Sequence, residues 1–206
     1  KKQCFMSEIE LRQSDREQVL NLFDCKIITT VDVSGKYQTF ADEACSRALS
    51  EMHRNYPNGV YKDQCRGQEF REQSKIITDK IVGELLRDFG DSDKAKIVVA
   101  LPWRAGLAFV SSFREAGITK FYHFDIQRDE KTAKPIFATE NGDVSDDSIV
   151  IIADPMLATG GSAITAINKL QSKGVLKNNI IMMSVVSAPV GVAKILSFGA
   201  RVITAF

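Results

Sequence analysis

Residues 149–166 read Ile-Val-Ile-Ile-Ala-Asp-Pro-Met-Leu-Ala-Thr-Gly-Gly-Ser-Ala-Ile-Thr-Ala, and this stretch decides the fold. Its apolar first part predicts a buried strand over 148–153. A helix is predicted over 162–172, closed by Gly174. A glycine-rich loop that leads from a strand straight into a helix gathers unpaired backbone N–H groups and a partial positive charge at one point. Such a point favours an anion.

The loop between this strand and this helix carries polar groups suited to a phosphorylated sugar. Gly160 and Gly161 allow close backbone approach and positive φ, and Thr159 and Ser162 add hydroxyl donors. Asp154 follows the strand, where its carboxylate would accept from ribose hydroxyls directly or through a metal. The alternative is an ordinary strand–helix turn capped by Ser162. The motifs G-x-x-x-x-G-K-[ST] and G-x-G-x-x-G are both absent here, which excludes those nucleotide-binding loops.

The chain from residue 67 onward alternates strands and helices. Apolar runs predict further strands over 97–101, 121–127, 179–186 and 201–205. Amphipathic patterns predict further helices over 67–90, 105–115 and 190–197. The apolar face of the first of these helices is expected to contain Phe70, Ile77, Ile81 and Leu85. This alternation indicates an α/β fold, a parallel sheet with helices on both faces, which binds ligands beyond the carboxyl ends of its strands.

The first 66 residues have a different character and are assigned to an N-terminal accessory segment, with the main domain over 67–206. They predict a short helix over 14–23, a strand over 26–33 and a turn over 55–59. A helix is predicted over 40–54, with Phe40, Ala44, Ala48 and Met52 on one face. No residue pattern here points to chemistry, so the segment is expected to provide accessory packing or an oligomer contact.

Composition narrows the class of protein. The net charge of +1 argues against a nucleic-acid binder or an acidic-membrane binder. No apolar run approaches the roughly 18 residues of a membrane span, and no signal peptide is visible. Cys4, Cys25, Cys45 and Cys65 lack metal-ligand spacing and are expected to be free thiols, which fits a cytoplasmic protein. Because the sequence begins at Lys1, the possibility of a targeting segment that has been removed stays open.

The nine residues Asp154–Ser162 resemble the phosphoribosyl pyrophosphate motif of uracil phosphoribosyltransferases. Other members of the type I phosphoribosyltransferase superfamily generally carry a second acid where Pro155 stands. Residues 103–106, Trp-Arg-Ala-Gly, resemble the R-A-G turn of that family, and Arg128-Asp129-Glu130 its R-D-E segment. Residues 188–191, Ala-Pro-Val-Gly, resemble its A-P-x-G stretch. The resemblance covers about residues 67–206, in the family order.

This resemblance implies transfer of ribose 5-phosphate to uracil, giving UMP and pyrophosphate in pyrimidine salvage. It implies that Arg104 and Arg128 neutralise the pyrophosphate, Asp154 holds the ribose hydroxyls, and the backbone over 158–162 holds the 5-phosphate. Mg²⁺ bound with phosphoribosyl pyrophosphate is the expected cofactor. A homodimer or higher oligomer is expected. The expected substrate-binding residues are Arg104, Arg128, Asp154, Pro155, Met156, Leu157, Ala158, Thr159, Gly160, Gly161 and Ser162.

Two departures from the family keep alternatives open. The family continues beyond the position of Phe206 into a Gly-Asp-rich segment that recognises uracil, and the given chain stops before it. The family also carries a β-hairpin arm where this chain has only residues 90–96. The leading hypothesis is an active uracil phosphoribosyltransferase. The alternatives are a non-catalytic relative with a binding, regulatory or assembly role, and a phosphoribosyltransferase for another base. Asp129 and Glu130 are not favoured as an acid–base pair, because the reaction barely needs one.

Overall fold

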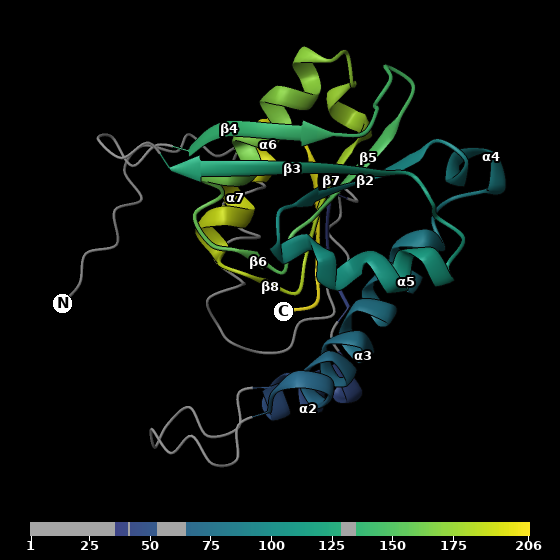
Figure 1. Cartoon of the computed structure of the whole chain (residues 1–206), viewed down its shortest axis with the longest axis vertical. Coiled ribbons are helices and arrows are strands. Elements are labelled where there is room, and N and C mark those ends of the chain that lie inside the picture. The colour runs from purple at the N-terminus through teal and green to yellow at the C-terminus, as the bar shows by residue number, and fades with distance from the viewer. Residues whose placement is uncertain (1–35, 41, 53–64, 129–134) are drawn as a thin grey trace.

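The computed structural model describes residues 36–40, 42–52, 65–128 and 135–206, and its centre is a seven-stranded sheet (Figure 1). The strand order is β1-β9-β7-β5-β2-β3-β4. The strands are β1 (Tyr37–Thr39), β2 (Ile97–Pro102), β3 (Phe121–Arg128), β4 (Pro135–Asn141), β5 (Ile149–Ala153), β7 (Ile180–Ser184) and β9 (Arg201–Thr204). A separate two-stranded sheet joins β6 (Met156–Leu157) to β8 (Val186–Ser187).

All neighbouring pairs in the large sheet are parallel except β3 and β4, which are antiparallel. The carboxyl ends of six strands therefore meet at one edge. The loops that follow β2, β3 and β5 all leave from that edge, as the sequence predicts for a ligand site.

Helices cover both faces of the sheet. They are α2 (Glu43–Met52), α3 (Gly67–Leu86), α4 (Asp91–Lys94), α5 (Val110–Glu115), α6 (Gly161–Ser172) and α7 (Pro189–Phe198), with the 3-10 helices η3 (Ala105–Phe109) and η4 (Lys177–Asn179). Strand side chains alternate between two cores: Val150 and Ile152 pack with α6 and α7, while Ile151 and Ala153 pack with α3 and α5. The α/β architecture with two covered faces is confirmed.

Most predicted elements of the main domain lie within a few residues of their expected bounds, but four details were wrong. The antiparallel strand β4 was not predicted. The helix predicted over 105–115 begins as the 3-10 helix η3. The first long helix ends at Leu86 rather than near Gly90, and α4 follows it. Of the four residues predicted for the apolar face of that helix, Ile77, Ile81 and Leu85 are buried, whereas Phe70 is 41% exposed.

The described parts of the first 66 residues join the main body. Strand β1 extends the sheet by pairing with β9, and α2 packs against α3. Helix α2 buries Cys45 and Ala48 while Ala44 is exposed, because residues spaced by four drift about 40° around a helix at each step. The elements predicted over 14–23, 26–33 and 55–59 lie outside the described residues. The boundary at residue 66 stays a prediction.

Two further expectations from the sequence concern membrane spans and the cysteines. Within the described ranges, no helix combines the length and the apolar character that crossing a membrane requires. Cys45 and Cys65 are buried, and Cys45 is a free thiol, while Cys4 and Cys25 lie outside the described residues.

Candidate functional site

The glycine loop joins β5 to α6 and ends in a left-handed turn. Gly160 is the N-cap residue of α6, with φ 73°, and no side chain makes a cap hydrogen bond. The helix begins at Gly161. The Ile164 N–H donates to the Gly160 carbonyl at 2.9 Å, as expected when Gly160 is the N-cap residue. The alternative in which Ser162 caps the helix was therefore wrong. The N–H groups that open α6 are left for an anion.

The start of the loop is fixed by main-chain hydrogen bonds to the segment after β7. The Asp154 N–H donates to the Met183 carbonyl at 3.0 Å. The Pro155 carbonyl accepts from the N–H groups of Val185 and Val186, both at 3.0 Å. Strand β6 then runs parallel to β8, and the Ala188 N–H donates to the Leu157 carbonyl at 2.7 Å. The loop path is therefore set by backbone, with little dependence on side chains.

Helix α7 touches the loop at a point where only glycine fits. A Cβ atom on Gly191 would lie 2.4 Å from the Ala158 carbonyl oxygen, and 3.0 Å from Cγ of Leu157. Backbone cannot yield as a flexible side chain would. The A-P-x-G stretch noted in the sequence therefore has a structural reason: its glycine lets α7 support the loop.

The side chains of the loop differ in exposure. Met156, Ala158, Thr159 and Ser162 are exposed, and Pro155 is partly buried. Leu157 belongs to the core beneath α6, so only its backbone can face a ligand. The residues predicted from the motif are thus brought together, but they divide into those that offer side chains and those that offer main chain.

Asp154 lies at the carboxyl end of β5 and is partly buried. Burial raises the pKa of its carboxyl group, and the hydrogen bond from the Met156 N–H to Oδ1, at 3.3 Å, opposes that rise only in part. The pKa is raised overall. A partly desolvated carboxylate at this place is a strong acceptor for the hydroxyls of a bound sugar.

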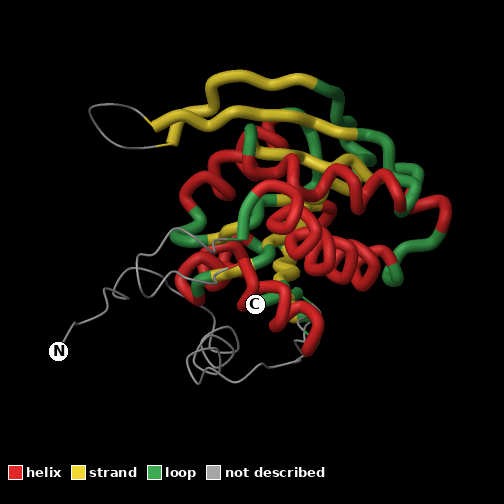
Figure 2. The backbone as a smooth tube through the Cα atoms, turned by 60° about the horizontal axis from the view of Figure 1, so that its bottom comes forward, coloured by secondary structure: helices red, strands yellow, loops and turns green. Residues whose placement is uncertain are grey.

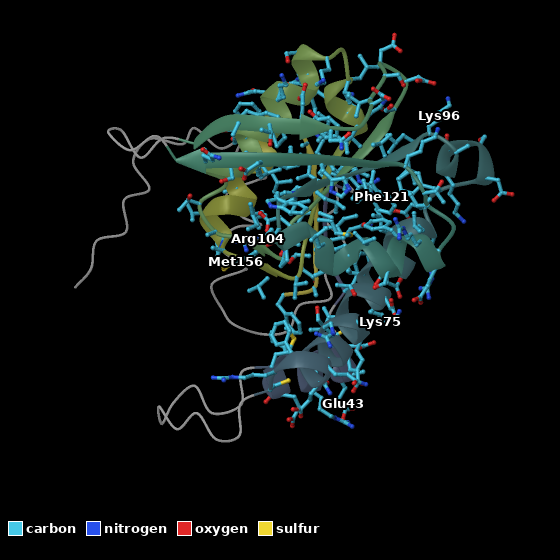
Figure 3. All side chains as sticks on the ribbon, in the orientation of Figure 1. Glu43, Lys75, Lys96, Arg104, Phe121 and Met156 are labelled. Carbon is cyan, nitrogen blue, oxygen red and sulfur yellow. The ribbon has the colours of Figure 1, made fainter. Side chains whose placement is uncertain are left out.

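The Arg104 turn follows β2 and lies against the end of β5. A Cβ atom on Gly106 would lie 2.9 Å from the Ala153 carbonyl oxygen, so the turn approaches the residue just before Asp154. The Trp103–Arg104 peptide bond is cis. Arg104 is exposed, and no described residue hydrogen-bonds or ion-pairs with its guanidinium. Figure 3 shows Arg104 and Met156 at the same edge of the sheet.

The second predicted arginine, Arg128, is the last residue of β3 and pairs with Pro135 of β4. Its backbone therefore ends at the same edge as β2 and β5. The placement of its side chain lies outside what the structure describes, as do Asp129 and Glu130.

A cavity of about 430 Å³ opens beside the Arg104 turn. It is lined by Trp103, His123, Phe124, Asp125, Thr139, Glu140 and Asn141. Trp103 is 58% exposed, and Nδ1 of His123 is buried without a hydrogen-bond partner among the described residues. This cavity was not predicted, because strand β4 supplies three of its residues and was itself not predicted.

A buried hydroxyl cluster was also missed. The hydroxyl of Ser187 lies 2.6 Å from that of Ser184 and donates to Oγ1 of Thr204 at 3.1 Å. Thr204 in turn donates to the Phe206 carbonyl at 2.7 Å. The cluster ties β8 to β7 and β9. Three hydroxyl residues at the ends of neighbouring strands were visible in the sequence, but only the strand order brings them together.

Comparison with known proteins agrees with this geometry. A family model described as uracil phosphoribosyltransferase matches residues 66–204. The uracil phosphoribosyltransferase of Lactiplantibacillus plantarum is 33% identical over 152 residues, covering 65% of this chain and 71% of that protein. The one from Ligilactobacillus salivarius is 34% identical over 177 residues, covering 77% of this chain and 79% of that protein.

Solved structures support the fold. The AQ2163 protein from Aquifex aeolicus superposes with a TM-score of 0.66 at 19% identity, over 82% of this chain and 86% of that one. An APRTase from Giardia lamblia superposes with a TM-score of 0.51 at 20% identity, over 65% of this chain and 83% of that one. At these identities the likeness speaks for the architecture alone.

Proposed function

Because the chain belongs to the uracil phosphoribosyltransferase family, we propose that it transfers ribose 5-phosphate from phosphoribosyl pyrophosphate to uracil, giving UMP and pyrophosphate. The observation that carries the proposal is the meeting of the α6 N-terminus, Asp154 and the Arg104 turn at one edge of the sheet. This reaction belongs to pyrimidine salvage, and we place it in the cytoplasm.

In this reaction, charge develops at two places. The sugar C1 becomes oxocarbenium-like while its bond to pyrophosphate breaks, and the leaving pyrophosphate gains negative charge. We assign neutralisation of that charge to Arg104, whose guanidinium has no ionic partner among the described residues, with Arg128 as the second cation. The protein acts by positioning and by preorganised electrostatics, without a covalent intermediate.

The 5-phosphate is assigned to the loop, and the ribose hydroxyls to Asp154. The N–H groups that open α6 and the hydroxyls of the exposed residues Thr159 and Ser162 are available to an anion at the helix N-terminus. Asp154 Oδ1 already accepts from Met156, and Oδ2 has no described donor, so it can accept from a ribose hydroxyl. This fixes the sugar between the phosphate loop and the Arg104 turn.

Mg²⁺ is the proposed cofactor, carried by the substrate. No group of three or more His, Cys, Asp and Glu residues in the described ranges could hold a metal ion without help. The Oδ2 atom of Asp154 and the phosphate oxygens are the hard ligands that Mg²⁺ prefers. Bound in this way, Mg²⁺ would neutralise charge on the pyrophosphate. We further propose a homodimer or higher oligomer, which light scattering would test.

The test is UMP formation from uracil, phosphoribosyl pyrophosphate and Mg²⁺ by the full chain. Arg104→Ala should lower kcat/KM about a hundredfold, because one charged contact to the leaving group is worth roughly 3 kcal/mol. Arg87→Ala is the matched control, since Arg87 pairs with Glu84 on the surface, and its kcat/KM should stay within twofold. Normal turnover by Arg104→Ala would contradict the assignment of Arg104 to the pyrophosphate site.

A base panel and a binding measurement separate the alternatives. If the protein turns over another base and not uracil, that base is the substrate, and the protein is a phosphoribosyltransferase for that base. Binding of phosphoribosyl pyrophosphate without turnover of any base would favour a non-catalytic relative.

A further inference from the structure

The β3–β4 hairpin stands at the edge of the sheet and carries Arg128 at its outer end. Strand β4 has no sheet neighbour other than β3 among the described strands. A register shift between Asp125 and Ile126 also interrupts the pairing of the two strands. Figure 2 shows the hairpin extending along one side of the molecule. Strand β3 pairs with β2 only over Phe121–Phe124, so beyond Phe124 backbone pairing with the edge strand β4 alone leaves the position of Arg128 relative to the phosphate loop weakly determined.

Glu140 of β4 joins the hairpin to helix α6. Its carboxylate accepts from the hydroxyl of Tyr122 and from Nζ of Lys173, the latter at 2.8 Å. Lys169 approaches the same carboxylate at 3.5 Å. Burial raises the pKa of Glu140, but the hydrogen bonds from Lys173 and Tyr122 and the charges of both lysines outweigh that effect and lower it overall. Glu140 is therefore a carboxylate at neutral pH.

Aromatic rings extend this contact toward the outer end of the hairpin. Phe124 of β3 stacks on Phe137 of β4 with ring centroids 5.5 Å apart. Nζ of Lys169 lies 5.4 Å from the Phe137 centroid, and Nζ of Lys173 lies 5.6 Å from that of Tyr122. Each lysine thus contacts both the carboxylate and a ring, so both strands are held.

The two lysines belong to the same helix that forms the phosphate site. Lys169 lies in the last turn of α6 and Lys173, four residues later, is its C-cap residue, while the first residue of α6 is Gly161 of the loop. A single rigid element therefore carries the anion-binding N–H groups at its N-terminus and the hairpin contacts toward its C-terminus. Figure 1 shows α6 beside β4, and the two elements are in contact.

We propose that Glu140, Lys169 and Lys173 form a clamp that sets the position of Arg128 relative to the phosphate loop, an inference that rests on the proposed function. The three are positioning residues, because they act through the hairpin and lie away from the loop that receives the phosphate. All three side chains are about one-third exposed, so their ion pairs contribute little to global stability. The effect of breaking the clamp is expected in substrate binding instead.

The first experiment compares two carboxylates. Glu140→Gln should raise KM for phosphoribosyl pyrophosphate about fivefold to tenfold, with kcat and the melting temperature nearly unchanged. Glu115→Gln is the matched control, since Glu115 bonds to Lys75 at 2.7 Å on another part of the surface, and its KM should stay within twofold. Equal KM values for the two variants would overturn the clamp.

The second experiment asks whether Glu140 acts through Arg128. In an Arg128→Ala background, Glu140→Gln should have no further effect on KM, because the residue that the clamp positions is gone. A full additional loss in the double variant would mean that Glu140 acts in another way, and would overturn the proposal.

Calorimetric titration with phosphoribosyl pyrophosphate and Mg²⁺, without uracil, separates failure of the clamp from failure of the proposed function. If the wild type makes no UMP but binds the ligand, weaker binding by Glu140→Gln than by Glu115→Gln supports the clamp, and equal binding overturns it. If the wild type does not bind the ligand at all, both the clamp and the proposed function are overturned.

Discussion

The phosphate loop and the β3–β4 hairpin flank the same site, but different forces hold them. The loop is held by main-chain hydrogen bonds that the Asp154 N–H donates and the Pro155 and Leu157 carbonyls accept, and by the close approach of Gly191. The hairpin has backbone pairing on one side and depends on the side chains of Glu140 and its lysines for the other. One half of the site is therefore built from backbone geometry and the other from tertiary side-chain contacts.

This difference has consequences for mutation and for motion. Main-chain bonds survive most substitutions and fail only where a new side chain collides with backbone. Contacts between partly exposed charged side chains are lost one residue at a time and are weakened by salt. The loop should therefore be rigid and should tolerate most substitutions except at a few glycines. The position of the hairpin should instead change with substitutions of its charged side chains and with salt.

The largest expected effect comes from Gly191→Ala, which would place a methyl group against the Ala158 carbonyl. We expect phosphoribosyl pyrophosphate to bind about a hundredfold more weakly, with a loss of about 2 kcal/mol in unfolding free energy. Calorimetric titration and denaturant unfolding measure the two. Gly83→Ala is the control: Gly83 lies within α3 with open space around it, and alanine there should stabilise by about 0.5–1 kcal/mol. Unchanged binding by Gly191→Ala would mean that the loop moves to accommodate the methyl group and is not held rigidly by backbone.

Asp154→Asn should weaken activity and strengthen the fold. Because burial raises the pKa of Asp154 above its value in the unfolded chain, the folded state loses stability as pH rises from that value through the folded pKa. The variant should therefore be more stable than the wild type at pH 7, and the difference should shrink toward pH 4. Its kcat/KM should fall about tenfold. Thermal unfolding across this pH range checks the sign, and a less stable variant at pH 7 contradicts it.

Hydrogen exchange should distinguish the two regions directly. The amides of Asp154 and of residues 185–188 should exchange at least about tenfold more slowly than those of β4, because each donates to a main-chain carbonyl, whereas β4 is an edge strand. Raising NaCl to 0.5 M should speed exchange in β4 by a few-fold and leave the loop unchanged. Exchange rates that are equal in both regions, or equally sensitive to salt, would contradict the proposal that backbone holds the loop and side chains hold the hairpin.

The smallest expected effect on the site comes from Thr204→Val, which removes the centre of the hydroxyl cluster under β8. The unfolding free energy should fall by about 1–2 kcal/mol, while KM and kcat stay within twofold, because backbone still holds the loop. Thr78→Val is the matched control: Thr78 is equally buried and bonds to Ser112 far from the site. A tenfold loss of activity in Thr204→Val alone would show that side chains also position the loop.

The same difference explains what could be predicted from sequence. The strand, loop and helix around Asp154 are contiguous, and their periodicity and glycines determine the local structure. Strand β4 was missed because it begins with Pro135 and lacks a long apolar run, so its strand state depends on pairing with β3. Glu140 looks like any surface acid, since its partners lie 29 and 33 residues further along the chain.

Local signals also misplaced details. The pattern for α2 pointed correctly to Ala48 but also to Ala44, whereas the packing of α2 on α3 buries Cys45 in place of Ala44. Three-residue strands such as β1 carry no readable period, so its place beside β9 follows only from the fold.

Trp103 has a practical consequence. It is the only tryptophan in the chain, it immediately precedes Arg104, and 58% of it is open to solvent. Indole emission shifts with the polarity of its surroundings, so all tryptophan light from this protein reports on one side of the candidate site. Intrinsic fluorescence can therefore follow ligand binding beside the Arg104 turn without an added label.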